Sequence, residues 1–241
     1  MADAEAMVKK GTLYGLGVGP GDPELITVKA WRLLSLVPVI AYPTANGEPS
    51  LARRIAAPFI PEDAVELPFA VPMEKERAPA QAAYAQAAAA IAAHLDEGRD
   101  VAVLCEGDPF FYGSFMYLHQ RLESDYEAVV IPGVSSLTAT AAVVGRPLAA
   151  RNDCLKVLPA PIGPERLAQE IEGAEAVAII KIGRHFDMVF RVLNDLGLAS
   201  RAVIVEAATR EDQKITRLSE APPGFRPYFS TILVYKGGEP W

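Results

Sequence analysis

The chain has 241 residues, 51% of them hydrophobic and 22% charged, which fits one large folded domain or two compact ones. Residues 1–131 carry 10 basic against 18 acidic residues and residues 132–241 carry 13 against 12, a balance that argues against nucleic-acid binding. No apolar run nears the roughly 20 residues of a membrane span or opens the chain as a signal peptide, so we predict a cytoplasmic protein without a membrane partner.

The cysteines and histidines form no pattern typical of a metal site or a disulfide framework. Cys105 and Cys154 make no CxxC pair, and His94, His119 and His185 have no HxxxH spacing. We therefore expect no disulfide and no metal held by Cys or His, while metal ligation by carboxylates stays open.

Short apolar runs alternate with helical patterns along the whole chain. This alternation predicts an α/β fold with two α/β domains and mostly parallel sheets, divided where the charge balance shifts, into 1–131 and 132–241. The last strands, 214–219 and 229–236, have no helix between them, so we expect them to pair antiparallel at an edge of the second sheet. Strands are expected at 12–16, 39–42, 101–105, 128–131, 155–158, 176–181, 202–205 and 229–235, and helices at 24–36, 51–57, 80–96, 115–123, 135–144, 164–171 and 186–196.

The first strand ends in a glycine-rich turn, YGLGVGPGD at 14–22, that leads into a helix. Open α/β sheets place ligands at such strand ends, and glycines let the backbone approach a ligand closely. Pro20 stands where a dinucleotide fingerprint needs glycine, and Asp22 and Glu24 bring negative charge to the helix start. The turn predicts a small-molecule site that does not hold phosphate, with helix capping as the alternative role of the acidic pair.

Later strand ends carry turns of the same kind. CEGDPFFYG at 105–113 combines close backbone approach with carboxylate and apolar groups, and IPGVSS at 131–136 opens a helix with serines that cap it or contact a ligand. KIG at 181–183 and EAATR at 206–210 complete the set, which together predicts a shared cleft. Because no GxSxG or Cys–His–Asp pattern marks a nucleophile, we expect chemistry that depends on positioning two reactants.

The pieces GVGPGDPELIT, EGDPFFYGS and IPGVSS, in this order, resemble the tetrapyrrole (class III) S-adenosylmethionine-dependent methyltransferases from residue 11 to about residue 237. Within that family, GPGDPELITVKAWRLL followed by VIAYP at 39–43 looks most like the precorrin-2 C20-methyltransferases of cobalamin biosynthesis. The resemblance implies the tetrapyrrole methylase fold with an active-site trough between its two domains, and a homodimer. It also implies S-adenosylmethionine as methyl donor, S-adenosylhomocysteine as product and a tetrapyrrole substrate.

The resemblance assigns roles to the residues at matching positions. Asp22 is the expected catalytic base, or else a contact to pyrrole N–H groups. The expected cofactor-binding residues are Pro20, Glu106, Gly107, Asp108, Tyr112, Ser135, Ser136, Lys181, Ile182, Ala207, Ala208, Thr231 and Ile232. The expected substrate-binding residues, which include arginines because the implied substrate bears many carboxylates, are Gly19, Gly21, Tyr42, Arg53, Arg146, Arg151 and Arg184.

The implied reaction is an in-line attack of the electron-rich C20 meso carbon of precorrin-2 on the sulfonium methyl group, followed by proton loss to give precorrin-3A. Cobalt-factor II C20-methylation and uroporphyrinogen-III C-methylation stay open as alternatives. A methylase of this fold acting on ribosomal RNA or diphthamide is a further alternative, although the acidic first half weighs against RNA. Outside enzymes, a nucleotide-type ligand-binding protein on a doubly wound scaffold also fits the glycine turns.

Overall fold

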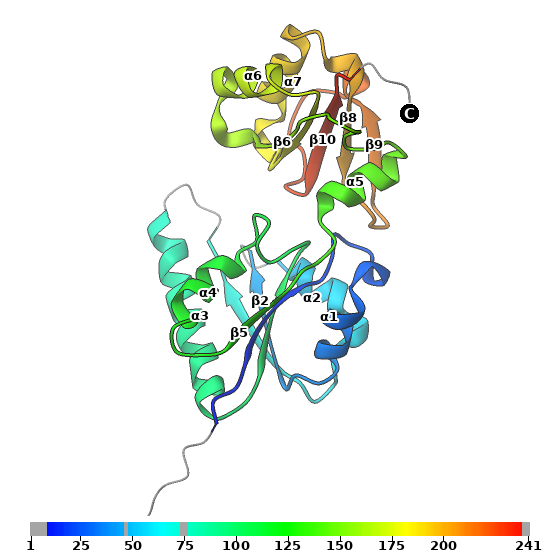
Figure 1. Ribbon diagram of the computed structural model, residues 1–241. Helices are drawn as coiled ribbons and strands as arrows, with labels where there is room; N and C mark the ends of the chain where they lie inside the picture. Colours follow the sequence, from blue (N-terminus) through cyan, green and yellow to red (C-terminus); the bar gives the residue numbers. More distant parts are fainter. Residues whose placement is uncertain (1–8, 46–47, 73–76, 238–241) are drawn as a thin grey trace, which may run out of the picture. The chain divides into compact units, whose positions relative to one another are not determined.

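The computed structural model describes residues 9–45, 48–72 and 77–237. The chain divides into two compact units, Met1–Ser135 and Ser136–Trp241, each with its own sheet and helices (Figure 1). This division falls between two serines of the IPGVSS segment, whereas the charge balance placed it after residue 131. Within the described ranges, no helix is both long and apolar enough to cross a membrane.

The first unit is built on a five-stranded sheet in the order β3-β2-β4-β1-β5, in which every neighbouring pair is parallel. All five strands therefore end at one edge of the sheet, which is where parallel α/β sheets place ligands. The strands are β1 (Leu13–Gly17), β2 (Val39–Thr44), β3 (Val65–Ala70), β4 (Val101–Cys105) and β5 (Ala128–Ile131), and the helices are η1 (Pro23–Leu25), α1 (Val28–Leu34), α2 (Leu51–Ala56), η2 (Ala57–Phe59), α3 (Arg77–Asp96) and α4 (Phe115–Leu122).

Helices cover both faces of this sheet, with α3 and α4 on one side and α1 and α2 on the other (Figure 1). The alternation of side chains along β4 divides the core, since Val101 and Val103 pack with α3 and α4 while Ala102 and Leu104 pack with α1 and α2. β4 is buried at every position, as expected of a central parallel strand covered on both faces.

Two features of this unit differ from the sequence-based expectations. β3 was not expected, because Pro68 interrupts its apolar run; it fits here because β3 is the edge strand, where a missing backbone donor is tolerated. The single helix expected at 24–36 is divided, because the Thr27 side chain accepts a hydrogen bond from Ala30 N at 3.3 Å and starts α1 after η1.

The second unit holds a mixed five-stranded sheet in the order β6-β7-β10-β8-β9. Its β6–β7 pair is parallel, and β10 and β9 run antiparallel to their neighbours. Helices α6 and α7 pack on one face and α5 on the other. The elements are α5 (Ser136–Val144), β6 (Leu155–Pro159), η3 (Ala160–Ile162), α6 (Pro164–Glu172), β7 (Ala176–Ile180), η4 (Gly183–His185), α7 (Phe186–Asp195), η5 (Ala199–Arg201), β8 (Ala202–Glu206), β9 (Lys214–Arg217), η6 (Leu218–Glu220) and β10 (Ser230–Tyr235).

The expectation that the last two strands pair with each other is wrong. β10 lies between β7 and β8 in the middle of the sheet, and β9 pairs with β8 at the edge. Their sequences explain the difference, since all six residues of β10 are buried, whereas the KITR strand is mostly exposed and carries charge suited to an edge. Of the eight strand pairs in the described chain, five are parallel, and the expected two-domain α/β fold is confirmed.

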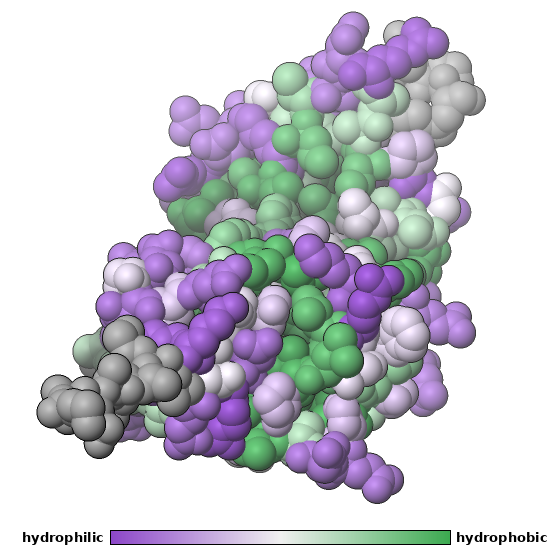
Figure 2. Space-filling view, turned by 60° about the horizontal axis from the view of Figure 1, so that its bottom comes forward, coloured by the Kyte–Doolittle hydropathy of each residue, from purple (hydrophilic) through white to green (hydrophobic). Residues whose placement is uncertain are grey.

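Several large apolar side chains remain on the surface. Val28 and Leu36 in the first unit are 66% and 72% exposed, and Phe225 in the second is 73% exposed. In the view of Figure 2, apolar areas reach the surface between polar side chains. Single exposed apolar residues are ordinary on a protein surface, and adjoining ones are more informative. Tyr228 and Phe229 are adjacent in the sequence and are 45% and 44% exposed.

Candidate functional site

The turns after β1 and β4 are joined to each other by backbone hydrogen bonds. Gly107 N donates to Gly19 O at 2.7 Å and Gly19 N donates to Gly107 O at 3.3 Å, forming an isolated antiparallel bridge beyond the strand ends. Both glycines have positive φ, 79° for Gly19 and 65° for Gly107, a conformation that other residues adopt at a cost. The first two predicted motifs therefore form one continuous backbone surface.

The turn after β5 packs against the same place. A Cβ atom on Gly133 would lie 2.0 Å from Gly107 O, and one on Gly17 would lie 2.6 Å from that same oxygen. Only glycine permits this approach, because a side chain on either residue would collide with backbone that cannot move aside. The glycines of all three strand-end motifs in the first unit thus serve close packing of backbones.

Asp108 holds these turns together. Its Oδ1 accepts from the backbone N–H of Phe110 at 2.9 Å and of Phe111 at 3.1 Å, and its Oδ2 accepts from Gly133 N at 3.1 Å. Three of the acceptor positions of the carboxylate are therefore used within the protein. Asp108 connects the β4 turn to the β5 turn, a positioning role that the sequence did not predict.

Glu106 differs from the other carboxylates near the strand ends. It follows β4 directly, and its Oε1 accepts one hydrogen bond from Ala52 N at 3.2 Å, at the start of α2. Burial raises the pKa of Glu106 above its ordinary value, and two backbone hydrogen bonds oppose that shift only in part. A desolvated carboxyl group at a strand end is suited to exchanging a proton.

Asp22, the predicted catalytic residue, has the geometry of the capping alternative. Its Oδ1 accepts from Glu24 N at 2.9 Å, and it is the N-cap of η1. Pro20 and Gly21, in the same turn, are half-buried between β1 and η1. Ser135 is half-buried and Ser136 exposed, at the beginning of α5.

In the second unit, the predicted residues gather where β7 and β8 end and β10 begins. Ala207 N donates to Phe229 O at 3.0 Å, and Thr231 pairs with Val205 in the β8–β10 ladder. Burial lowers the pKa of Lys181, which follows β7. The remaining predicted residues here, Ile182, Ala208 and Ile232, are buried.

Unusual backbone conformations coincide with the predicted residues. Among the residues that the structure describes, five other than glycine have positive φ, between 44° and 68°, and four of the five are predicted site residues. Such conformations cost about 1–3 kcal/mol each and tend to cluster at functional sites. The five are Tyr112, Arg151, Lys181, Ala207 and Thr209.

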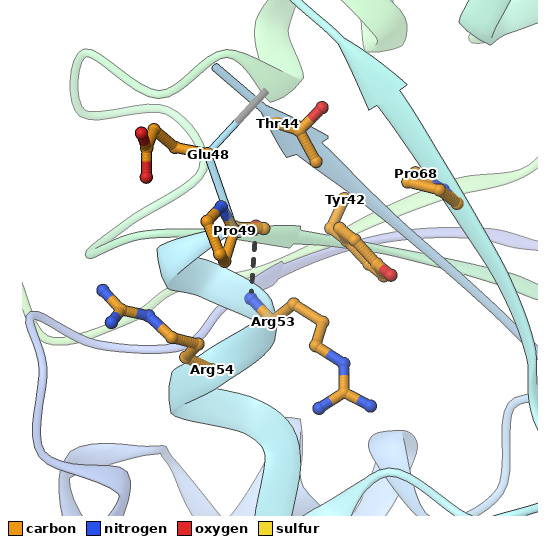
Figure 3. Close-up of a pocket in the computed structure, with 8 residues that line it drawn as sticks. Tyr42, Thr44, Glu48, Pro49, Arg53, Arg54 and Pro68 are labelled. Carbon is orange, nitrogen blue, oxygen red and sulfur yellow. Dashed lines mark hydrogen bonds between the residues drawn. The ribbon is translucent and has the colours of Figure 1, made fainter. Parts of the chain in front are cut away.

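The predicted arginines do not share one environment. Arg53 lines a pocket of about 330 Å³ in the first unit (Figure 3). It forms a hydrogen-bonded cluster with Tyr42 and Glu66. In the second unit, Arg146 lies over the Tyr235 ring at 5.0 Å. Arg184 is exposed on η4, next to His185.

Sequence reasoning missed two residues beside that pocket. Glu66 lies on the unexpected strand β3 and holds Arg53, and Arg54 lines the pocket directly. The ArgArg pair at 53–54 was visible in the sequence, but only the structure shows which guanidinium is already paired. Among the described residues, no group of three or more His, Cys, Asp or Glu side chains is arranged to hold a metal ion.

Residues 12–222 match the family described as Tetrapyrrole (Corrin/Porphyrin) Methylases. The chain is 39% identical to the precorrin-2 C(20)-methyltransferase of Sinorhizobium sp over 93% of this chain and 95% of that protein. It is 31% identical to the cobalt-precorrin-2 C(20)-methyltransferase of Salmonella typhimurium over 95% and 98%. It is also 40% identical to the cobalamin biosynthesis protein CobIJ of Mycobacterium tuberculosis over 96% of this chain but 47% of that protein, so it spans about half of CobIJ.

Solved structures share the fold. A cobalt precorrin-4 methyltransferase, CbiF, superimposes with a TM-score of 0.71 at 24% identity, covering 93% of this chain and 94% of CbiF. A uroporphyrin-III C-methyl transferase from Thermus thermophilus, complexed with S-adenosyl homocysteine, gives a TM-score of 0.65 at 23% identity, covering 93% and 97%. By the match over residues 12–222 and the full-length relatives, this chain belongs to the tetrapyrrole methylase family.

Proposed function

We propose that this protein is an S-adenosylmethionine-dependent C-methyltransferase that converts precorrin-2 to precorrin-3A by methylating C20. The observation that carries the proposal is the 39% identity to a precorrin-2 C(20)-methyltransferase along almost the full length of both chains. The cobalt-precorrin-2 enzyme matches at 31% over a similar span, which favours the metal-free substrate. A comparison of kcat/KM for precorrin-2 and cobalt-precorrin-2 distinguishes the two.

In this proposal, the turns after β1, β4 and β5 of the first unit contact the methyl donor. Their glycines bring the three turns into direct contact, and Asp108 fixes the arrangement. In the second unit, the strained residues Lys181 and Ala207 are proposed donor contacts, as the family resemblance implies. The related Thermus thermophilus structure contains S-adenosyl homocysteine, the product that such a donor leaves, which supports this choice of cofactor.

The protein's own part in the reaction is alignment, exclusion of water and removal of one proton. A C–C bond forms between C20 and the methyl carbon while the C–S bond breaks and its electron pair stays on sulfur. The proton then leaves C20, and the electron pair of the C–H bond restores the conjugated system. We propose that Glu106 accepts this proton, because Asp22 caps η1 and Asp108 already accepts hydrogen bonds from three N–H groups.

We further propose that the enzyme acts in the cytoplasm as a homodimer, as the family resemblance implies. Exposed apolar residues such as Phe225 provide surface of the kind that interfaces use. Sedimentation equilibrium gives the oligomeric state directly.

Ligand binding tests the cofactor proposal before any substrate is made. Because a ligand that binds only the folded protein stabilises it by about 2.7 kcal/mol at 100 times Kd, saturating S-adenosylmethionine or S-adenosylhomocysteine should raise Tm by several degrees. NAD and ATP should leave Tm unchanged, since the β1 turn does not suit phosphate. A rise with NAD or ATP and none with S-adenosylmethionine would exclude the methyltransferase and favour a nucleotide-binding protein.

A further inference from the structure

The pocket of about 330 Å³ in the first unit lies at the carboxyl ends of β2 and β3 and the start of α2. In Figure 3, Arg53 and Arg54 extend from α2 in different directions, while Tyr42 and Thr44 extend from β2. A volume of this size admits a carboxylate side chain with part of the ring that bears it. The lining residues are Tyr42, Thr44, Glu48, Pro49, Ser50, Arg53, Arg54 and Pro68.

The positive charge of Arg53 is already paired with the carboxylate of Glu66. Its Nη2 and Nε donate to Glu66 Oε1 at 2.8 Å and Glu66 Oε2 at 3.1 Å, and the Tyr42 hydroxyl donates to Glu66 Oε2 at 2.6 Å. The hydrogen bonds from Arg53 and Tyr42 lower the pKa of Glu66, and the bond to Glu66 raises the pKa of Arg53. The cluster therefore forms a fixed wall of the pocket with no net charge.

Arg54 is different. Its side chain is exposed, it lines the pocket, and no ion pair joins it to a described residue, including Glu48. Its guanidinium is thus a positive charge whose donors face solvent. Planar guanidinium groups bind carboxylates through two parallel hydrogen bonds, which gives both affinity and orientation.

The pocket adjoins the proposed methyl-transfer site. β2 is the neighbour of β4 in the sheet, and Glu106 at the end of β4 accepts a hydrogen bond from Ala52 N in α2, one residue before Arg53. A flat macrocycle with its meso carbon near Glu106 would extend its peripheral groups along this edge.

We propose that this pocket binds one carboxylate side chain of the tetrapyrrole through Arg54, with the Arg53–Glu66–Tyr42 cluster as its rigid support. The inference rests on the proposed function for the identity of the substrate. It predicts that removal of the Arg54 charge weakens binding and removal of the Glu48 charge does not, because Arg54 attracts an anionic group and Glu48 repels it.

The test measures KM for precorrin-2 and, independently of turnover, Kd for uroporphyrin III, a stable tetrapyrrole with eight carboxylates. Arg54→Gln should raise both about tenfold or more, as loss of a charge-assisted hydrogen bond does. Glu48→Gln should leave both constants unchanged or lower them. Arg32→Gln, which removes an exposed arginine of α1 outside the pocket, is the matched control. The Kd for S-adenosylhomocysteine should stay the same in all three variants.

The inference is overturned if Arg54→Gln behaves like Arg32→Gln in both measurements, or if Glu48→Gln weakens binding as much as Arg54→Gln does. The second result would indicate a cationic or neutral occupant. A wild-type protein that binds uroporphyrin III through Arg54 but does not methylate precorrin-2 would refute the proposed function and leave the pocket assignment standing. If the wild type methylates precorrin-2 and Arg54→Gln has no effect, the pocket assignment is refuted and the proposed function stands.

Discussion

The carboxyl groups near the ends of β1 and β4 have different hydrogen-bond partners, and this separates their roles. Asp108 binds three backbone N–H groups, Asp22 caps a short helix, and Glu106 accepts from Ala52 N and has its pKa raised by burial. The sequence identified all three as site residues. It could not rank them, because the ranking depends on backbone groups supplied from elsewhere in the fold.

Glu106→Gln should lower kcat by about a hundredfold or more, the usual range for removal of a general base. In the wild type, kcat should fall as the pH drops through the raised pKa of Glu106, because the protonated carboxyl group cannot accept the C20 proton. The variant should lose this part of the pH profile. Asp22→Asn should keep it; loss of the acidic limb in Asp22→Asn alone would identify Asp22 as the base instead.

The free energy of unfolding should depend on pH in the opposite sense to kcat. Between the unfolded pKa of glutamate, about 4.3, and the raised pKa of Glu106, the folded protein binds more protons than the unfolded chain. The free energy of unfolding therefore falls as pH rises through this window. Above it, Glu106→Gln should be at least as stable as the wild type in urea denaturation, so reduced activity would not reflect unfolding.

At the scale of elements, one carboxylate joins three of them. Glu66 on β3 binds Tyr42 on β2 and Arg53 on α2, and the Arg53 and Glu66 side chains are 37% and 31% exposed. Glu66→Gln should lower the free energy of unfolding at neutral pH by about 1 kcal/mol, a value reduced by this exposure.

The effect should depend on pH because Arg53 and Tyr42 lower the pKa of Glu66. The stabilisation is complete above the unfolded pKa of about 4.3 and is lost as the pH falls through the lower folded pKa. Urea titrations at pH 7 and pH 3 should therefore show a difference between wild type and Glu66→Gln that narrows at pH 3. Glu62→Gln, at an exposed position nearby in the sequence, is the control. An equal loss of unfolding free energy in both variants would contradict a stabilising role for the Glu66 interactions with Arg53 and Tyr42.

The sequence predicted strands well where their apolar runs are continuous, as at 101–105 and 176–181. It predicted them poorly where the existence or position of a strand depends on which strands it pairs with. β3 escaped prediction because Pro68 is acceptable only at a sheet edge, and edge position is a property of the whole sheet. β10 was placed at an edge because its connection to β9 lacks a helix, although its uninterrupted apolar sequence indicates a central strand.

At the scale of the whole molecule, the chain comprises two α/β units that each present chemistry-bearing turns at the ends of their strands. The glycine motifs were recognisable in the sequence as strand-end turns. Their mutual contacts were not, since the hydrogen bonds between Gly19 and Gly107 and the fit of Gly133 against Gly107 require the sheet order β4-β1-β5. The positive φ angles of Lys181 and Ala207 likewise have no signal in residue type.

The site of methylation tests the central claim most directly. Precorrin-2 is incubated with the protein and S-adenosylmethionine carrying a ¹³C-labelled methyl group, and the labelled position in the product is found by NMR. The account predicts one new methyl group, attached to C20, together with one equivalent of S-adenosylhomocysteine. Label on any other carbon, or no transfer by folded protein that binds both ligands, would contradict it.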